Sequence, residues 1–408
     1  MKGFGRGKGR GLYARHRLDL SLKDIFFGVL SSCRLGRRDR LESGVLGLCS
    51  VGEDGIVSYS VRSGWDLWLG AQGLRGGDEV LVSAVTHPDM VRIVRGHGLR
   101  AVPVDIDPQS LAPHPSALEA ALTPRTRALL IAHLFGGRMD LGPVAGFARE
   151  HGLILVEDCA QAFRGPERVG DPAADVSMYS FGTLKTSTAL GGAVLRVRDR
   201  EALRKMRESQ ARYPAQHRGP YLKKLLMALG LVVVSRPRPY GLLVRFCAWL
   251  GADLDGLVDG AVRAIPPREP DRAFFRRLRQ RPCAPLLAMI ARRIRTFDRE
   301  RLAGRAATGE RFARRLRAVD AHPGARSLWR THWLFPVVVP DPEALIEDLR
   351  KRGLDASRAT SSIAVVEPQA EDSPPTRARR MMSGVVFLPA YPGLPPHGFD
   401  VMADLVNG

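Results

Sequence analysis

Two neighbouring stretches decide the fold: residues 153–161 read LILVEDCAQ, and residues 176–185 read VSMYSFGTLK. Each begins with a short apolar run that is typical of a buried strand and ends in polar side chains. Similar apolar runs lie elsewhere in this half of the chain, at 80–84, 101–104, 128–132 and 193–197. Helical periods separate several of them, at 89–97, 116–122 and 141–151. This alternation predicts an α/β domain with a mainly parallel central sheet flanked by helices.

Polar residues follow several of these strands. In open parallel sheets, ligands bind in the crevice beyond the carboxyl ends of the strands. Asp158 closes one predicted strand, Ser180 and Lys185 follow the next, and His87 follows an earlier one. We therefore expect these side chains to face one crevice. Purely structural roles stay open for these three residues: Asp158 as a helix N-cap, Ser180 as a turn residue and His87 as an ordinary loop histidine.

Lys185 is unusual because the chain supplies nearly all of its positive charge as arginine. It is the only lysine between Lys23 and Lys205, and it lies among small and apolar residues. A deprotonated lysine forms an imine with an aldehyde, whereas a guanidinium does not. This observation favours a covalent role for the amine, although a stray surface lysine stays possible.

These residue types match the needs of pyridoxal 5'-phosphate (PLP) chemistry. The cofactor needs a lysine as Schiff-base partner and a carboxylate that keeps the pyridine nitrogen protonated. Its phosphate needs donors, and a helix that begins at Ser63-Gly64-Trp65 would offer backbone N–H groups. Lys185, Asp158 and Ser180 would supply the remaining groups.

Residues 62–207 resemble the DegT/DnrJ/StrS family of sugar aminotransferases, which have fold type I of the PLP enzymes. The resemblance rests on short motifs in the same order and spacing: Gly77-Asp-Glu-Val80, Pro103-Val-Asp-Ile-Asp107, Thr123-Pro-Arg-Thr126, Ala132-His-Leu-Phe-Gly136, Glu157-Asp-Cys-Ala-Gln161 and Ser180-Phe-x-x-x-Lys185. A weaker match continues through His332-Trp-Leu-Phe-Pro336 and Leu388-Pro-Ala-Tyr-Pro392. It implies a large PLP-binding domain and a smaller C-terminal α/β domain.

The resemblance also implies a role for each matching residue. Lys185 would carry PLP as a Schiff base, and Asp158 would contact the pyridine nitrogen. Gln161 would lie near the phenolic oxygen, and His87 would stack on the ring. Ser180 and the backbone at Gly64 and Trp65 would hold the phosphate. The implied reaction moves an amino group, usually from glutamate, to a keto-sugar on a nucleoside diphosphate, in a homodimer with active sites at the subunit interface.

The chain departs from the family pattern at three short motifs and in residues 206–270, which are longer and more apolar than the family usually carries. Trp65 replaces the usual threonine of Ser-Gly-Thr, which removes one phosphate hydroxyl. Leu190 stands where an acidic residue commonly precedes the Gly-Gly pair. Arg279-Gln-Arg281 replaces the Asn-x-Arg segment that reaches the neighbouring subunit, so Arg279 and Arg281 become candidates for substrate or neighbouring-subunit contact.

We divide the chain into a basic N-terminal segment (1–50), a PLP-binding domain (51–205), an apolar and basic helical insert (206–300) and a C-terminal domain (301–408). The first 17 residues are rich in Gly, Arg and Lys, and we expect them to be mobile. The insert contains two apolar stretches, 221–234 and 240–250, each too short to span a bilayer. It serves either dimer packing or contact with a membrane surface, which would suit a lipid-linked substrate.

Composition narrows the remaining choices. The formal net charge is +20, from 62 Lys and Arg against 42 Asp and Glu, which favours acidic partners. The sequence shows no nucleic-acid-binding motif, so we expect no nucleic-acid partner. The five cysteines are widely spaced and indicate neither a metal site nor disulfides, and we find no signal peptide. We therefore expect a cytoplasmic enzyme, with a non-catalytic PLP-binding regulator as an alternative.

Overall fold

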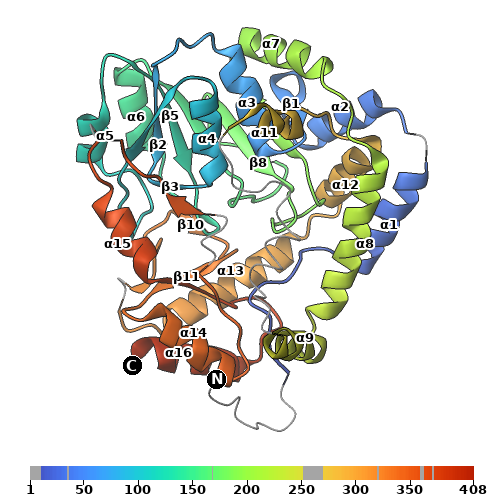
Figure 1. The fold of residues 1–408 in the computed structure, drawn as a ribbon, viewed down its shortest axis with the longest axis vertical. Helices are drawn as coiled ribbons and strands as arrows, with labels where there is room; N and C mark the ends of the chain where they lie inside the picture. Colours follow the sequence, from blue (N-terminus) through green and yellow to red (C-terminus); the bar gives the residue numbers. More distant parts are fainter. Residues whose placement is uncertain are drawn as a thin grey trace.

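The computed structural model of the chain describes residues 11–34, 36–167, 169–250, 270–318, 321–358, 363–369 and 372–408. Part of the predicted insert, residues 251–269, lies outside the described residues. A large α/β domain lies above a smaller C-terminal domain in Figure 1, where helix α8 runs down one edge of the molecule and α9 lies at its lower end.

The large domain contains a seven-stranded sheet in the order β1-β9-β8-β7-β5-β2-β4. Its strands are β1 (Gly55–Ser58), β2 (Glu79–Ser83), β4 (Arg100–Val104), β5 (Thr126–Ala132), β7 (Ile154–Asp158), β8 (Val176–Ser180) and β9 (Ala193–Val197). The five strands from β8 to β4 are parallel, while β9 pairs antiparallel with both β8 and β1. The prediction of a mainly parallel sheet is confirmed: β9 runs against its neighbours, and the edge strand β1, which was not predicted, runs in the same direction as the five parallel strands.

Side chains alternate between the two faces of this sheet, as they must in any strand. Val80 and Val82 face a core formed with α3 (Val61–Ala71), α4 (Pro88–Gly96), α7 (Arg200–Ala211) and α11 (Arg272–Leu278). Leu81 faces the opposite core, which contains α5 (Pro115–Ala121) and α6 (Gly142–Glu150). The near-continuous apolar strands of the sequence are thus explained, since both faces are covered by helices.

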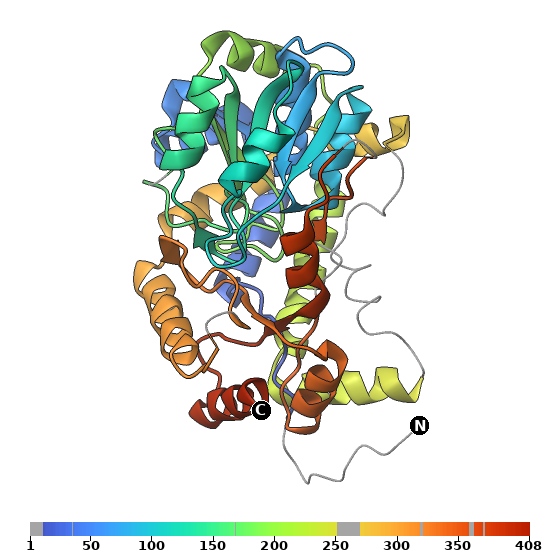
Figure 2. The same cartoon turned by 90° about the vertical axis from the view of Figure 1, so that its left-hand side faces the viewer.

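A further layer covers the sheet beside β8 and β9. It contains α1 (Leu22–Cys33), α2 (Arg38–Leu48), α8 (Arg218–Val234) and α12 (Ala284–Arg295), which share one apolar core. Helix α9 (Pro237–Trp249) follows α8 and extends away from the body of the molecule in Figure 2. No helix in the described part of the chain is both long enough and apolar enough to cross a membrane.

The C-terminal domain packs α13 (Arg299–Ala313), α14 (Pro342–Lys351), α15 (Thr376–Gly384) and α16 (Pro396–Asn407) around the antiparallel pair β11 (Phe335–Val338) and β13 (Val385–Leu388). Two short strand pairs connect it to the large domain. β10 (Trp329–Arg330) pairs with β6 (Gly137–Arg138), and β12 (Ala364–Val365) pairs with β3 (Val85–Thr86). The small domain is therefore held beside the carboxyl ends of the large-domain strands.

The expectation of a mobile N-terminal segment is wrong for residues 11–17. Tyr13 forms a bridge with Leu354, and the Arg15 guanidinium donates to Asp355 at 2.9 Å. Arg17 lies over the Tyr391 ring at 5.0 Å. These contacts fix the segment against the C-terminal domain, because each arginine finds a specific partner there. Residues 1–10 lie outside the described residues.

Candidate active site

Lys185 lies in a tight loop that leaves the carboxyl end of β8. Its backbone N–H donates to Gly182 O at 3.0 Å, which closes a turn after the strand. Farther along, Ser187 and Leu190 have φ of 59° and 64°, in the left-handed region that non-glycine residues seldom adopt. Ser187 N–H donates to Asp19 at 2.7 Å, and its hydroxyl donates to Arg293 O at 3.1 Å. The loop is thus held in a strained shape by neighbouring elements, as is common at functional sites.

The lysine amine is half-buried and its pKa is strongly changed. Burial lowers the pKa of Lys185 to about 8, while the Asp158 charge opposes the fall and Arg62 adds to it. An amine with that pKa is about one-tenth neutral at pH 7, far more than an ordinary lysine. A lowered pKa of this kind is what a nucleophilic lysine needs.

Asp158 ends β7, the strand next to β8, and is buried. Within the described residues its side chain accepts one hydrogen bond, from Ala160 N–H at 2.9 Å. Burial raises the pKa of Asp158, and the Ala160 bond and the Lys185 charge partly offset that rise. The accepted bond closes a local turn and no helix begins here, so the residue is not a helix N-cap.

Ser180, Gln161 and His87 also lie at strand ends, and each has a local partner. Ser180 Oγ accepts from Gly182 N–H at 3.2 Å. Gln161 Oε1 accepts from Phe135 N–H at 2.7 Å, so its amide N–H₂ is the end that can donate to a bound group. His87 Nδ1 accepts from Asp89 N–H at 3.1 Å and caps α4, which fixes the plane of its ring. Ser180 thus has the bond of a turn residue and His87 has a local bond in its loop. These bonds orient both side chains and do not exclude a ligand.

The predicted phosphate-binding helix begins three residues earlier than expected. Ser60 is the N-cap of α3, and its hydroxyl accepts from Ser63 N–H. Gly64 N–H already donates to Ser60 O at 3.0 Å. The backbone N–H groups that a helix start leaves without an intrahelical partner therefore belong to Val61 and Arg62. Gly64 has a packing role, because a Cβ there would lie 2.6 Å from the Leu195 side chain.

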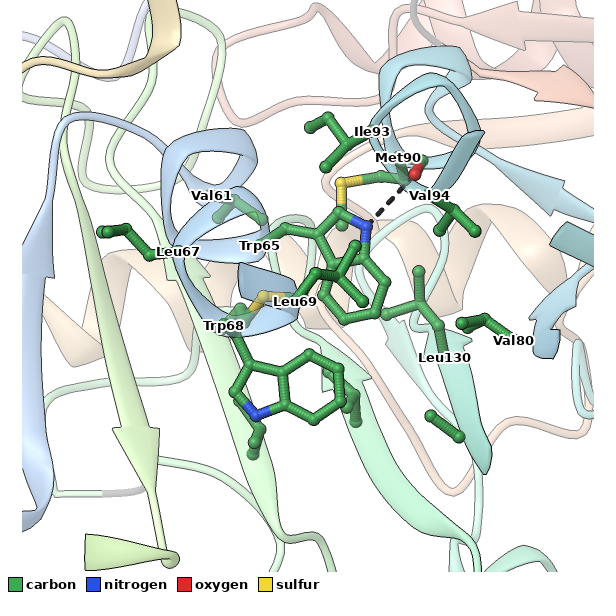
Figure 3. Close-up of a cluster of buried hydrophobic side chains, with 14 of the residues drawn as sticks. Val61, Trp65, Leu67, Trp68, Leu69, Val80, Met90, Ile93, Val94 and Leu130 are labelled. Atoms are coloured by element: carbon green, nitrogen blue, oxygen red, sulfur yellow. Dashed lines mark hydrogen bonds between the residues drawn. The ribbon is translucent and has the colours of Figure 1, made fainter. Parts of the chain in front are cut away.

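The Trp65 side chain points into the core instead of toward the strand ends. Figure 3 shows its indole among apolar side chains of α3, α4 and the sheet, with the ring N–H donating to Met90 O at 3.1 Å. Its ring stacks on Trp68 with centroids 5.1 Å apart. The residue that replaces the family threonine thus stabilises the fold, and its backbone N–H lies beyond the open N–H groups at the start of α3.

Three residues near Lys185 were not predicted from the sequence. Trp333 presents its ring to the Lys185 ammonium at 4.8 Å, and His16 contacts the same ring edge-on at 5.6 Å. Burial lowers the pKa of His16 to about 4. Arg62 ion-pairs with Asp89 at 2.6 Å in the first turn of α3. Trp333 lies within the weaker motif match and Arg62 directly precedes Ser63-Gly64, so both carried a signal, whereas His16 carried none.

Arg279 and Arg281 are placed differently from one another. Arg279 forms a two-pronged ion pair with Asp66, both contacts at 2.9 Å, and its guanidinium lies over Phe275. Arg281 is half-buried, and its Nε has no hydrogen-bond partner among the described residues. Arg279 is therefore committed to its own subunit, and Arg281 is the better candidate for an outside contact.

Glu157, the neighbour of Asp158, lies in a separate buried polar cluster. It accepts from His133 at 3.1 Å, from Arg138 at 2.7 Å and from the Cys159 thiol at 3.3 Å. Burial opposes ionisation, but these partners prevail and lower the pKa of Glu157 to about 2. Ligand atoms of His133, Glu157 and Cys159 lie within 4.8 Å of one another, as in a metal site. The Arg138 cation already neutralises the carboxylate, so we interpret the group as structural. All five cysteines of the chain have free thiols.

Comparison with solved structures identifies the class of fold. An aminotransferase, TlmJ, from Streptoalloteichus hindustanus superposes with a TM-score of 0.69 over 97% of this chain and 98% of that chain, at 20% sequence identity. The sugar aminotransferase CalS13 from Micromonospora echinospora gives a TM-score of 0.66 over 97% and 99%, at 18% identity. The chain has the fold of type I PLP enzymes.

Sequence comparison adds a family resemblance. Residues 51–225 match the model of the DegT/DnrJ/EryC1/StrS aminotransferase family. It is 38% identical over 153 residues to the L-glutamine:2-deoxy-scyllo-inosose aminotransferase of Micromonospora echinospora, a match that covers 37% of this chain and 35% of that protein. It is also 35% identical over 178 residues to a UDP-N-acetyl-3-dehydro-alpha-D-glucosamine 3-aminotransferase of Acidithiobacillus ferrooxidans, covering 42% and 48%. The matches thus span between a third and a half of these relatives.

Proposed function

We propose that the chain is a PLP-dependent aminotransferase that moves an amino group, from glutamate, to a keto group of a nucleotide-linked sugar. The observation that carries the proposal is the pairing of Lys185 and Asp158 at the ends of neighbouring strands. The amine has a pKa lowered to about 8 and the carboxyl has a raised pKa, so both depart from ordinary surface groups. Perturbed groups of this kind cluster at functional sites.

The donors present fit the cofactor. Lys185 would hold its aldehyde carbon, and Asp158 would accept the pyridine N–H. Ser180, the N–H groups of Val61 and Arg62 and the Arg62 guanidinium would hold its phosphate, since a helix start and an arginine both favour an anion. When bound, the ring withdraws electrons from the substrate carbon.

The side chains of this chain would then perform three tasks. The Lys185 amine, when it is neutral, would take the proton from the substrate carbon and pass it to the cofactor. Asp158 would stay ionised beside the ring nitrogen. Trp333 and His16 would cover the lysine from the side of the C-terminal domain and exclude water, which protects reactive groups from hydrolysis.

The acceptor class is supported by the relatives, whose names describe amino transfer to a cyclitol and to nucleotide sugars. A related GDP-perosamine synthase of Caulobacter vibrioides is 34% identical over 145 residues. Their common feature is a keto group on a six-membered polyhydroxylated ring. Glutamine is named as a donor for the cyclitol enzymes, so donor identity needs a direct test.

Two measurements on purified protein test this function. Borohydride treatment should trap the cofactor on Lys185, as located by mass spectrometry, and an adduct on another lysine would contradict the proposal. Separate addition of glutamate and glutamine should then show which donor converts the cofactor to its amine form by visible absorption. A protein that holds the cofactor on Lys185 but responds to no donor would favour the non-catalytic regulator.

We also propose a homodimer in which Arg281 reaches toward the neighbouring subunit. Arg279 is already bound to Asp66, whereas the buried Nε of Arg281 has no hydrogen-bond partner among the described residues, so Arg281 is the arginine of the two with bonding capacity left. Sedimentation velocity should give a dimer, and Arg281→Ala should weaken either dimerisation or substrate binding. A stable monomer with full activity would contradict this part of the proposal.

A further inference from the structure

Helices α8 and α9 carry apolar side chains on faces that the described part of the chain does not cover. On α8, Tyr221, Leu225 and Ala228 are buried against the helical layer. The exposed large apolar residues of the two helices are Leu226, Met227, Leu229, Val233, Leu242, Phe246, Trp249 and Leu250. A helix that is apolar on both sides is unusual for a surface position in water.

The exposed residues of α9 form a single stripe. Leu242, Phe246 and Trp249 follow one another at spacings of four and three residues, so they share one face of the helix. Trp249 is 79% exposed and Leu242 is 66% exposed. The rings of Phe246 and Trp249 lie 6.0 Å apart. Aromatic side chains with a polar N–H are typical of the boundary between lipid and water.

The opposite side of α9 is anchored to the protein. Tyr240 is buried and its hydroxyl donates to Asp355 at 2.5 Å, while Pro237 O accepts from Leu12 N–H at 3.0 Å. The helix is therefore held in place by the C-terminal domain and the N-terminal segment. Because these anchors set its orientation, the exposed stripe is a fixed feature and not an unfolded end.

The charge around these two helices has one sign. Between Ser209 and Leu250 the sequence contains no Asp or Glu, although acidic residues are common elsewhere. The basic residues of the same stretch are Arg212, Arg218, Lys223, Lys224, Arg236, Arg238 and Arg245. Among them, Arg212, Lys223, Arg236, Arg238 and Arg245 are exposed. The partner of this face should therefore be both apolar and anionic.

We propose that the exposed face of α8 and α9 binds the surface of an anionic lipid bilayer. Short helices of this kind lie in the headgroup region, with the apolar stripe directed toward the acyl chains and the cations toward anionic headgroups. A second copy of the chain fits less well. A two-fold contact brings the same surface of both subunits together, and these cations would then face one another. The surface is independent of the cofactor site, so it goes beyond the proposed function.

The test uses the full-length protein and sedimentation with liposomes. Vesicles of phosphatidylglycerol and phosphatidylcholine should bind the protein, vesicles of phosphatidylcholine alone should bind it weakly, and high salt should release it. The double variant Phe246→Ser/Trp249→Ser should weaken binding at least about tenfold. Arg238→Gln/Arg245→Gln should weaken it by a similar factor of about ten, since each cation contributes separately.

Matched controls separate the face from general effects. Leu328→Ser removes another exposed apolar side chain, 73% exposed, from outside the two helices. Arg276→Gln/Arg277→Gln removes two exposed charges from α11, a helix beside α3 (Figure 1) that is part of neither α8 nor α9. Both controls should bind vesicles as the unaltered protein does, and all variants should keep its melting temperature.

Three outcomes would overturn the proposal. The first is an unaltered protein that ignores anionic vesicles. The second is equal loss of binding in the controls, which would show a nonspecific effect of charge. The third is a change of oligomeric state in the α9 variants with unchanged vesicle binding, which would make the face a contact between subunits. The visible absorption of bound cofactor, measured in parallel, reports separately on the proposed function.

Discussion

Adjacent residues of β7 lie in two polar regions of opposite character. On one side of the strand, Glu157 has His133, Arg138 and Cys159 as partners, and its pKa falls to about 2. On the other side, Asp158 accepts a single hydrogen bond within the described residues, and its pKa rises. Because strand side chains alternate, adjacent residues separate a carboxylate that we interpret as structural from the carboxylate that we propose to contact the cofactor. A buried polar group whose hydrogen bonds are all made within the protein stabilises the fold. A buried polar group that can still accept hydrogen bonds remains available for a ligand.

The largest expected effect is at Lys185. Lys185→Arg keeps the positive charge but removes the nucleophile, so amino transfer should fall at least about 10³-fold. The measurement is steady-state transfer from the better amino donor, with borohydride trapping as a second readout. Lys205→Arg, on the exposed side of α7, is the matched control and should retain full activity. Unchanged turnover in Lys185→Arg would contradict the proposal that Lys185 carries the cofactor.

Asp158→Asn tests the other half of the pair. Asparagine can accept the same Ala160 bond, so the turn should persist while the charge is lost, and transfer should fall about 10²-fold. Because the Asp158 charge raises the pKa of Lys185, that pKa should also fall below about 8 in the variant. Asp199→Asn, at the N-cap of α7, is the control and should affect neither quantity. Loss of folding without a selective loss of activity would mean that Asp158 has a structural role, as Glu157 has.

Glu157→Gln should have the reverse pattern. It leaves the buried Arg138 guanidinium without its countercharge, which costs about 3–5 kcal/mol for a buried pair. The melting temperature should fall clearly, while protein that stays folded should still hold the cofactor on Lys185. Glu201→Gln is an informative control, because Glu201 also has a pKa lowered to about 2 but lies in an exposed pair. Exposed pairs contribute little, so its melting temperature should not change.

The same comparison predicts a pH dependence. A carboxyl whose pKa is lower in the folded state contributes stability above its unfolded pKa and loses that stability as the pH falls. For Glu157 the window runs from 4.5 down to about 2. The melting temperature of the unaltered protein should therefore fall steeply across that window. Glu157→Gln should show a shallower fall, and identical slopes would mean that other carboxyls dominate acid unfolding.

The sequence predicted the fold where the signal was local. The apolar runs of β7 and β8 and the polar residues at their ends were recognised because strand and loop follow each other directly in the chain. The start of α3 was misplaced because Ser60, its N-cap, was overlooked in favour of the Gly64 motif. That shift of three residues changes which N–H groups are open at the helix start, from Gly64 and Trp65 to Val61 and Arg62.

The residues that cover the site could not be predicted from the sequence, for a different reason. His16 and Trp333 are far from Lys185 in the chain, and only the packing of the C-terminal domain brings them together. The direction of the Trp65 side chain likewise follows from tertiary packing against α4. The roles of the candidate site residues remain predictions, whereas the mainly parallel sheet is confirmed, and residues 51–225 match the model of the family that the sequence resembles.

The smallest expected effect concerns Trp333, which contributes to the Lys185 region from the other domain. A cation held over an indole ring gains about 0.5–1 kcal/mol, which corresponds to about 0.4–0.7 pKa units in favour of the charged amine. Trp333→Leu should therefore lower the pKa of Lys185 further, and Trp333→Phe should lower it less. Competitive labelling of Lys185 in the cofactor-free protein as a function of pH measures this value.

A second tryptophan provides the control for Trp333→Leu, and hydration of the Lys185 amine opposes the expected fall in its pKa. Trp329→Leu removes a ring that lies over Arg164 and should leave Lys185 unchanged. Loss of Trp333 also admits water to the amine, and hydration favours the charged form, so it would raise the pKa. A fall in pKa would show that the ring contact dominates, whereas a rise would show that Trp333 acts chiefly by excluding water. Either sign measures what the small domain contributes to a group that the large domain positions.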